Sequence, residues 1–243
     1  MDKSLFVNGI HLNYIMSLKK WRVLNLKSVF KESQYPGSYS TFRKIITSLE
    51  SKNLIKSYQD PFSSKKYLFL TEHGEAYVGA KEGRPALSNE TLLHDSKVVE
   101  ICMLLTDFSA IKEVELEHQL VDRTSFKSTY RICPDALIHG ERKGQKFRMA
   151  FELELTQKTK AKYLAKIQQY LDSSAYDYVF YFFPGDGVYT SYKEHITETF
   201  SEKAFSKIIM GVNQTLLTKK FDIKKTKIHF QNKEVDIEIL FGN

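Results

Sequence analysis

Apolar residues recur at helical spacing through the first fifty residues of the chain. The stretches 11–20 and 24–33 each carry this pattern, and Pro36 and Gly37 break the chain after them. A third helix is predicted over 42–53, capped by Ser40 or Thr41. Its apolar stripe consists of Phe42, Ile45, Ile46 and Leu49.

Two alternating strands, 54–58 and 65–71, follow this helix around a turn rich in Asp, Pro and Ser, and a short segment, 72–78, follows them. Three helices and a basic two-stranded wing are the order of a winged helix-turn-helix, whose third helix enters the major groove of DNA. We expect its cations to contact phosphates. They are Arg43, Lys44, Lys52, Lys65 and Lys66.

Residues 48–78 resemble the recognition-helix and wing segment of MarR-like winged helices. Winged helices also serve as protein–protein modules, and that alternative stays open. The segment 79–90 mixes Gly, Pro and polar residues without periodicity and is predicted to be a linker. The predicted domains are therefore 1–80, a linker over 81–90, and 91–243.

The remainder of the chain alternates between helical and strand-like segments. A mostly buried helix is expected at 91–106, and three strands, a helix and a strand should follow it. The expected ranges are strands at 111–117, 130–138 and 147–155, a helix at 157–172, a strand at 176–183, a helix near 190–217 and a hairpin over 226–240. The predicted fold class is mixed α+β.

Composition excludes several classes of protein. The 243 residues are 42% hydrophobic and 27% charged, which is typical of a globular protein and not of a fibrous or disordered one. Two cysteines cannot form a disulfide framework or a four-thiolate zinc site. The longest apolar run, 178–183, is far shorter than the roughly 20 residues of a membrane span. We therefore expect a cytoplasmic protein without a membrane span, and its net charge of +7 favours a polyanionic partner.

Three acidic residues stand out in the predicted sheet. Asp135 follows Pro134 in one strand, and strand alternation puts Glu152 and Glu154 on one face of the next, whose other face is apolar. Clustered carboxylates repel one another unless a hard cation lies among them, so they are predicted ligands of Mg²⁺ or Mn²⁺. Asp135 lies on this face only if it pairs opposite an even-numbered residue of the next strand. The connection predicted over 139–146 does not determine that register.

A row of lysines follows the acidic strand. Lys158, Lys162 and Lys166 are spaced to lie along one side of the predicted helix, where they can bind phosphates beside the metal. Metal ions and cations arranged in this way suit the cleavage of phosphodiesters. The alternative is a solvent-facing hairpin whose acids pair with basic residues of the same hairpin, which are Arg142, Lys143, Lys146 and Arg148.

Pro134-Asp135, separated by sixteen residues from Glu152-x-Glu154, resembles the PD-(D/E)xK nuclease superfamily. The resemblance implies a restriction-endonuclease-like α/β domain. Glu154 occupies the usual lysine position, and in some members the lysine has moved to the next helix, which nominates Lys158. Glu100 lies on the helix that often supplies another acid in this superfamily.

The segments 92–105 and 131–171 together resemble MOBC-type plasmid relaxases and the related replication-relaxation proteins. The resemblance implies a bacterial endonuclease that nicks plasmid DNA at a transfer origin with an accessory mobilisation protein and conjugative coupling machinery. A non-enzymatic plasmid DNA-binding regulator and a double-strand restriction-type nuclease remain alternatives. The absence of any His-x-His pair disfavours a histidine metal cluster, while fourteen tyrosines leave a tyrosine-linked intermediate open.

Overall fold

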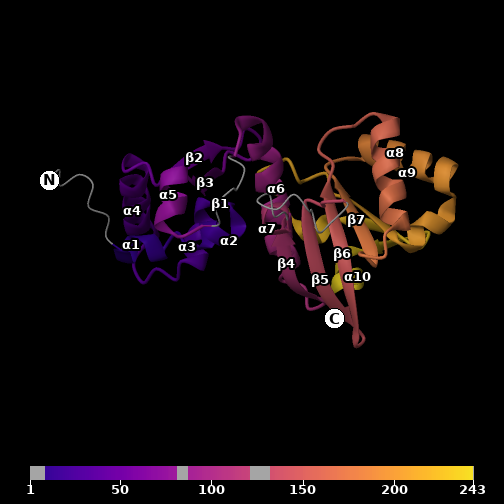
Figure 1. Cartoon of the computed structure of the whole chain (residues 1–243), viewed down its shortest axis with the longest axis horizontal. Helices are drawn as coiled ribbons and strands as arrows, with labels where there is room; N and C mark the ends of the chain where they lie inside the picture. Colours follow the sequence, from indigo (N-terminus) through magenta and orange to yellow (C-terminus); the bar gives the residue numbers. More distant parts are fainter. Residues whose placement is uncertain (1–8, 81–86, 121–131, 243) are drawn as a thin grey trace. The chain divides into compact units, whose positions relative to one another are not determined.

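The computed structural model describes residues 9–80, 87–120 and 132–242 (Figure 1). The chain divides into two compact units, Met1–Val99 and Glu100–Asn243, which are described separately below. Both contain helices and a β-sheet, so the predicted mixed α+β class is confirmed. Among the described residues, no helix has the length and apolar character that a membrane crossing requires.

The first unit combines short helices with a small antiparallel sheet, in which the strand order is β1-β3-β2. Its helices are α1 (Gly9–Asn13), α2 (Ser17–Trp21), α3 (Leu26–Glu32), α4 (Tyr39–Ser51), α5 (Glu72–Tyr77) and the start of α6 (Asn89–Leu105). Its strands are β1 (Val23–Asn25), β2 (Ile55–Gln59) and β3 (Lys66–Leu70). The predicted third helix and the two hairpin strands are therefore present.

Two details of the first unit differ from prediction. The cap of α4 is Ser38, whose hydroxyl accepts a hydrogen bond from the Thr41 amide at 3.2 Å, and not Ser40 or Thr41. The stretch 24–33 is not helical throughout, because β1 takes its first two residues into the sheet against β3. Asn25 then caps α3 by accepting from the Ser28 amide.

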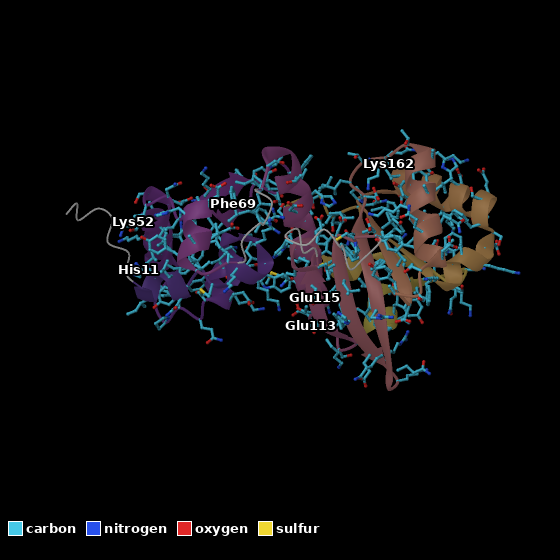
Figure 2. The ribbon with its side chains drawn as sticks, in the orientation of Figure 1. His11, Lys52, Phe69, Glu113, Glu115 and Lys162 are labelled. Carbon is cyan, nitrogen blue, oxygen red and sulfur yellow. The ribbon has the colours of Figure 1, made fainter. Side chains whose placement is uncertain are left out.

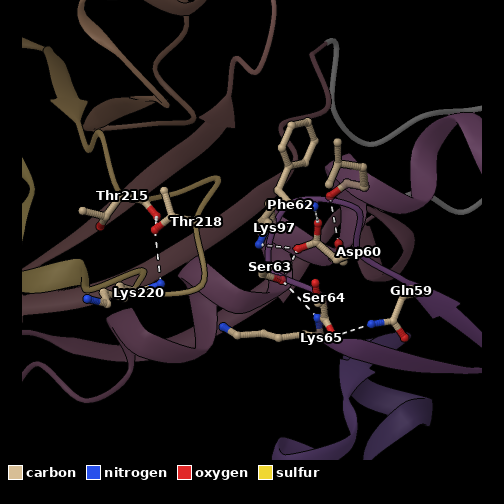
Figure 3. A network of polar contacts seen from close by, with 12 residues as sticks. Gln59, Asp60, Phe62, Ser63, Ser64, Lys65, Lys97, Thr215, Thr218 and Lys220 are labelled. Atoms are coloured by element: carbon tan, nitrogen blue, oxygen red, sulfur yellow. Dashed lines mark hydrogen bonds and ion pairs between the residues drawn. The ribbon is translucent and has the colours of Figure 1, made fainter.

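The turn between β2 and β3 is anchored by a buried ion pair (Figure 3). Lys97 on α6 contacts Asp60 at 2.9 Å, and both side chains are 0% exposed. Asp60 also accepts hydrogen bonds from the Phe62 amide and the Ser63 hydroxyl. Burial alone would raise the pKa of Asp60, but these donors and the lysine charge outweigh it and hold that pKa below its usual value.

This ion pair explains where the first unit ends. Lys97 ties the first half of α6 to the hairpin, so the division falls inside that helix, after Val99, rather than at the expected linker over 81–90. Residues 81–86 of that linker lie outside the described residues, and α6 begins at Asn89.

The second unit is built on a seven-stranded sheet with the order β10-β9-β8-β7-β6-β5-β4. Its strands are β4 (Ile111–Leu116), β5 (Ala136–Arg142), β6 (Gln145–Leu153), β7 (Tyr178–Phe183), β8 (Ile208–Val212), β9 (Lys227–Phe230) and β10 (Lys233–Asp236). Its helices are the end of α6, α7 (Glu117–Leu120), α8 (Lys160–Asp172), α9 (Asp186–Phe200), α10 (Ile237–Phe241) and the 3₁₀ turns η2 (Glu202–Ser206) and η3 (Ile223–Lys225).

Several predicted boundaries in this unit are wrong. The strand expected at 130–138 begins at Ala136 and continues to Arg142, and residues 130 and 131 lie outside the described residues. The expected loop over 139–146 is instead a two-residue turn, Lys143-Gly144, in which both residues have positive φ. The helix expected near 190–217 ends at Phe200, since 208–212 form the buried parallel strand β8.

The register of the β5–β6 hairpin decides which side chains share a face of the sheet. Ala136 pairs with Phe151 and Leu137 with Ala150, so the same register continued by one residue sets Asp135 opposite Glu152. The even-numbered positions of β6 therefore face the side of the sheet that α8 and α9 cover. The core on that side includes Leu137, Ala150, Tyr163, Ile167, Tyr170, Tyr181 and Tyr192.

We predict that Lys97→Met destabilises the first unit by about 3–5 kcal/mol, because it leaves the Asp60 carboxylate buried without its cation. The free energy of unfolding, measured by urea titration, tests this. The control is Lys66→Met, which removes a partly exposed pair with Glu50 (36% and 22% exposed) and should cost less than about 1 kcal/mol. Equal losses in the two variants would contradict the prediction.

Candidate carboxylate site on the central sheet

The sequence-predicted acids lie where β5 begins and β6 ends, on the face that α8 covers (Figure 1). Asp135 directly precedes β5 and its Oδ2 accepts a hydrogen bond from the Leu153 amide at 2.7 Å. This bond joins the start of one strand to the end of its neighbour. It sets the Asp135 carboxylate beside Glu152, whose side chain is 1% exposed.

Glu152 is held by two side chains of α8. Lys166 Nζ lies 2.6 Å from Glu152 Oε2, and the Tyr170 hydroxyl donates to Oε1. Burial first, and then the charge of Asp135, raise the pKa of Glu152 to about 7, although Lys166 and Tyr170 favour the ionised form. Lys166 and Tyr170 are one helical turn apart, so both reach the same carboxylate.

Lys166 stays charged in this environment. Burial lowers the pKa of its ammonium, but the negative charges around it outweigh burial and raise that pKa above the usual value. Glu152 makes the largest of these contributions, and Asp135 and Glu154 add to it. The site therefore sets carboxylates near one partly buried cation, whose side chain is 30% exposed.

Glu154 follows the end of β6 and has a different partner. Its backbone amide donates to the carbonyl of Phe182 on β7 at 3.0 Å, which extends the parallel pairing by one step. Its side chain is 2% exposed, and Oε1 accepts from Lys158 Nζ at 2.7 Å. Lys158 lies before α8, which begins at Lys160, so the prediction that it belongs to the helix is wrong.

Tyr181 on β7 is the neighbour of Glu152 in the parallel register. It is fully buried, and burial together with the charges of Glu152 and Glu154 raises the pKa of its hydroxyl far above the usual value. That hydroxyl has no hydrogen-bond partner among the described residues. Buried hydroxyl groups are normally hydrogen-bonded, so Tyr181 is a buried polar group beside Glu152 whose hydrogen-bonding capacity the described residues do not use.

The fit of a divalent metal ion depends on these donors. Asp135 and Glu152 are neighbouring carboxylates, the oxygen ligands that Mg²⁺ and Mn²⁺ prefer. Within the described residues, however, no group of three or more His, Cys, Asp or Glu side chains is placed to hold a metal ion. The structure therefore does not gather Asp135, Glu152 and Glu154 into the predicted three-acid cluster, because Lys158 holds Glu154 and Lys166 lies against Glu152.

Two other predicted site residues differ in exposure. Lys162 is exposed on α8 (Figure 2), whereas Lys166 of the predicted lysine row reaches Glu152. Glu100 is a buried acid on α6. The basic residues of the hairpin do not neutralise the acids: Arg142 donates to the Ile239 carbonyl and Arg148 to the Ser174 carbonyl.

Sequence analysis missed Tyr170 and Tyr181 as neighbours of Glu152. The signal for Tyr170 was present, because it lies four residues after Lys166 on the same helix. The position of Tyr181 depends on the parallel pairing of β6 with β7, which residue patterns alone do not give.

The predicted phosphate-contacting cations of the first unit differ in how exposed their side chains are and in whether their charge is matched within the unit. Arg43 and Lys44 are exposed on α4, as expected of a surface that meets a polyanion. Lys52 follows that helix (Figure 2), and Lys65 is partly buried before β3. Lys66 instead forms an ion pair with Glu50 at 2.8 Å, so its charge is already matched within the unit.

Comparison with family models, curated proteins and solved structures found no match to this chain.

We predict that the stability difference between Glu152→Gln and the unmodified protein changes with pH. The raised pKa means that the folded unmodified protein keeps a proton that the unfolded chain releases, so its stability falls as pH rises from about 4.5 to about 7. The variant should therefore gain relative stability over this window, by at most about 1.4 kcal/mol per pH unit. Urea titrations across pH 4–9 test this.

The control is Glu198→Gln, which removes an exposed partner of Lys160. The hydrogen bond from Lys160 lowers the pKa of Glu198, so its contribution is present above the unfolded pKa and is lost as pH falls. The pH trend of this control should have the opposite sign and be small. A flat difference for Glu152→Gln between pH 4.5 and 7 would contradict the burial argument.

Proposed function

We propose that this protein is a DNA endonuclease that combines a winged-helix DNA-binding unit with a nuclease unit of the PD-(D/E)xK type. The observation that carries the proposal is the pair of adjacent carboxylates, the half-buried Asp135 and the buried Glu152, with the charged Lys166 against the second of them. Buried charges cost free energy, so such an arrangement is more common at sites of chemistry than in structural cores.

The element order of the second unit supports the proposal. A helix, three antiparallel strands, a helix and a parallel strand follow one another as α6, β4, β5, β6, α8 and β7. A tight hairpin separates Pro134-Asp135 from Glu152, which agrees with the motif order of the PD-(D/E)xK resemblance. The resemblance nominates Lys158, which pairs with Glu154; we propose Lys166 on α8 for that role instead, because it lies against Glu152.

The residues present can contribute to phosphodiester cleavage in distinct ways. Burial and the charge of Asp135 raise the pKa of Glu152 to about 7, and a divalent cation held by Asp135 and Glu152 would favour the ionised carboxylate. Lys166 supplies a fixed positive charge next to it, suited to a phosphate oxygen. Asp135 and Glu152 would hold Mg²⁺ or Mn²⁺, which when bound supplies charge neutralisation and a more acidic water.

The first unit supports the DNA-binding part of the proposal. Its three-stranded sheet, with α4 directly before the β2–β3 hairpin, agrees with the order of a winged helix. The exposed Arg43 and Lys44 then lie on the helix that would enter the major groove. We propose duplex DNA as the partner of this unit.

The form of the activity that we propose is strand nicking at a plasmid transfer origin, in the bacterial cytoplasm, with an accessory mobilisation protein and the conjugative coupling machinery. One observation favours a second candidate, a DNA-binding regulator without catalysis. Both glutamates are held by lysines, and no group of three metal-ligand side chains occurs in the described ranges.

The deciding experiment follows supercoiled plasmid that carries the native origin region in Mg²⁺ and in Mn²⁺. We expect the unmodified protein to produce open circles and Asp135→Asn to produce none while it still retards DNA on a gel. Linear product would favour a double-strand nuclease of the restriction type. Retarded but uncut DNA with both proteins, in the presence of the accessory protein, would favour the regulator.

A matched pair of lysine variants tests the site more sharply. Lys166→Gln removes the cation beside Glu152 and should reduce nicking at least about 100-fold, which is the lower range for a group engaged in proton transfer or charge stabilisation. Lys162→Gln, on the same helix but exposed, should nick at the unmodified rate. Equal activity of the two variants would remove Lys166 from the mechanism.

We also predict that Arg43→Gln with Lys44→Gln weakens duplex binding without altering the carboxylate site. Each lost phosphate contact should lower the slope of log K against log salt by about 0.9, so the double variant should lose about 2. Fluorescence anisotropy at several salt concentrations measures this slope. The control is the double variant Lys219→Gln with Lys220→Gln, which removes two exposed charges from the second unit and should keep the slope.

A further inference from the structure

A hollow of about 450 Å³ lies at the β5–β6 hairpin end of the second unit's sheet. Its floor is apolar and its rim is basic. Its lining includes Arg142, Lys143, Lys146, Phe147, Tyr178 and Phe230. Side chains alternate between the two faces of a strand, and Phe147 is five residues before Glu152 on β6, so the two lie on opposite faces of the sheet. A second hollow of about 510 Å³ shares Lys146 and Phe147 with the first.

Three partly exposed aromatic rings form a row across this hollow. The Phe147 and Tyr178 rings are 5.9 Å apart, centroid to centroid, and the Tyr178 and Phe230 rings are 5.6 Å apart. They come from β6, β7 and β9, so the sheet itself fixes their spacing. Both pairs meet edge to face, with ring planes at 75° and 83° to each other, so the three rings do not form one flat platform. Each ring instead offers its own exposed part to a flat apolar group, at little cost in side-chain entropy.

Gly140 makes room for the first ring of the row. It pairs with Phe147 across the hairpin, and a Cβ atom at this position would lie 2.1 Å from the Phe147 ring. Any larger residue would therefore push the ring out of its place over β5. The absence of a side chain at Gly140 keeps the aromatic row in position.

The rim of the hollow is positively charged. Lys143 and Lys146 are exposed, and the Arg142 guanidinium is fixed by a hydrogen bond to the Ile239 carbonyl at 2.9 Å. Asp177 is the acidic residue of this lining, and its Oδ2 accepts from the Arg148 amide at 2.7 Å. The cationic rim thus outnumbers its acid, so the hollow favours an anionic ligand that also has an apolar, flat part.

We propose that this hollow binds single-stranded DNA. Bases would pack against the exposed parts of Phe147, Tyr178 and Phe230, while phosphates would contact Arg142, which shares their face of the sheet, and Lys143 in the turn. Exposed aromatic rings beside cations are the combination that single strands use, because their bases are unpaired and free to stack. In a duplex the base faces are covered, so duplex DNA could use only the cations.

This binding site is independent of the proposed cleavage. Phe147 is five residues before Glu152 on β6, about 17 Å along the strand, and on the other face of the sheet. None of its residues contacts the carboxylates in the interactions described above. A protein without nuclease activity could therefore still bind a single strand here.

The experiment measures binding of a fluorescent twelve-residue oligothymidylate and of a duplex of equal length, by anisotropy, to the full chain. Phe147→Leu keeps an apolar side chain but removes the stacking surface, and we expect it to weaken oligothymidylate binding about tenfold. Lys143→Gln should lower the salt slope for the oligothymidylate by about 0.7. Duplex binding should change less than twofold in Phe147→Leu.

Three controls make the outcome decisive. Binding measured in EDTA, without a divalent metal ion for cleavage, should be unchanged, which separates this proposal from the cleavage proposal. Phe221→Leu, a partly exposed ring elsewhere in the second unit, and Lys219→Gln with Lys220→Gln should also bind normally. Thermal melting of each variant checks that it is folded.

Unchanged oligothymidylate binding in folded Phe147→Leu would overturn the proposal. An equal loss of duplex and single-strand binding would also overturn it, because the surface would then be a general electrostatic one. Binding to phosphatidylserine vesicles that Phe147→Leu abolishes, without any effect on the oligothymidylate, would identify an anionic membrane surface as the occupant instead.

Discussion

The second unit depends on one interaction, the contact between Glu152 and Lys166 beneath α8. A carboxylate that is almost fully buried destabilises a fold unless a partner compensates its desolvation. Lys166 reaches Glu152 because α8 packs Tyr163, Ile167 and Tyr170 against the sheet, which fixes the rotation of the helix. The packing of α8 and the charge balance of the site are therefore a single constraint, and neither can be satisfied without the other.

The turn at Lys143-Gly144 sets the second constraint. A two-residue turn leaves one register for the β5–β6 hairpin, and that register aligns Asp135 with Glu152. A slip by one residue would exchange the two faces of β6 and turn Glu152 away from Lys166 toward the apolar face of the sheet. The hydrophobic pattern of the strand and the short turn thus select the same pairing, which brings two carboxylates together despite their mutual repulsion.

Some of this arrangement could be predicted from the sequence, and the physical reasons for the failures are specific. Alternation along β6 was sufficient to place Glu152 and Glu154 on one side and the apolar residues on the other. Residues 208–212 were read as part of a helix because a continuous apolar run suits a buried parallel strand and a buried helix equally well. The lysine partner of each acid could not be predicted. Which lysine meets which glutamate depends on where α8 begins, and helix boundaries are the least certain part of a periodic pattern.

The same limit applies to the aromatic row, which no local pattern indicates. Phe147, Tyr178 and Phe230 are far apart in the sequence, and only the strand order β9-β8-β7-β6 brings them together. Strand β6 contributes to both surfaces of the unit: its end carries the buried acids on one face and its beginning carries Phe147 on the other. Because the two surfaces share this strand, the hairpin turn that sets the register of the carboxylates also determines where the Phe147 ring lies over Gly140.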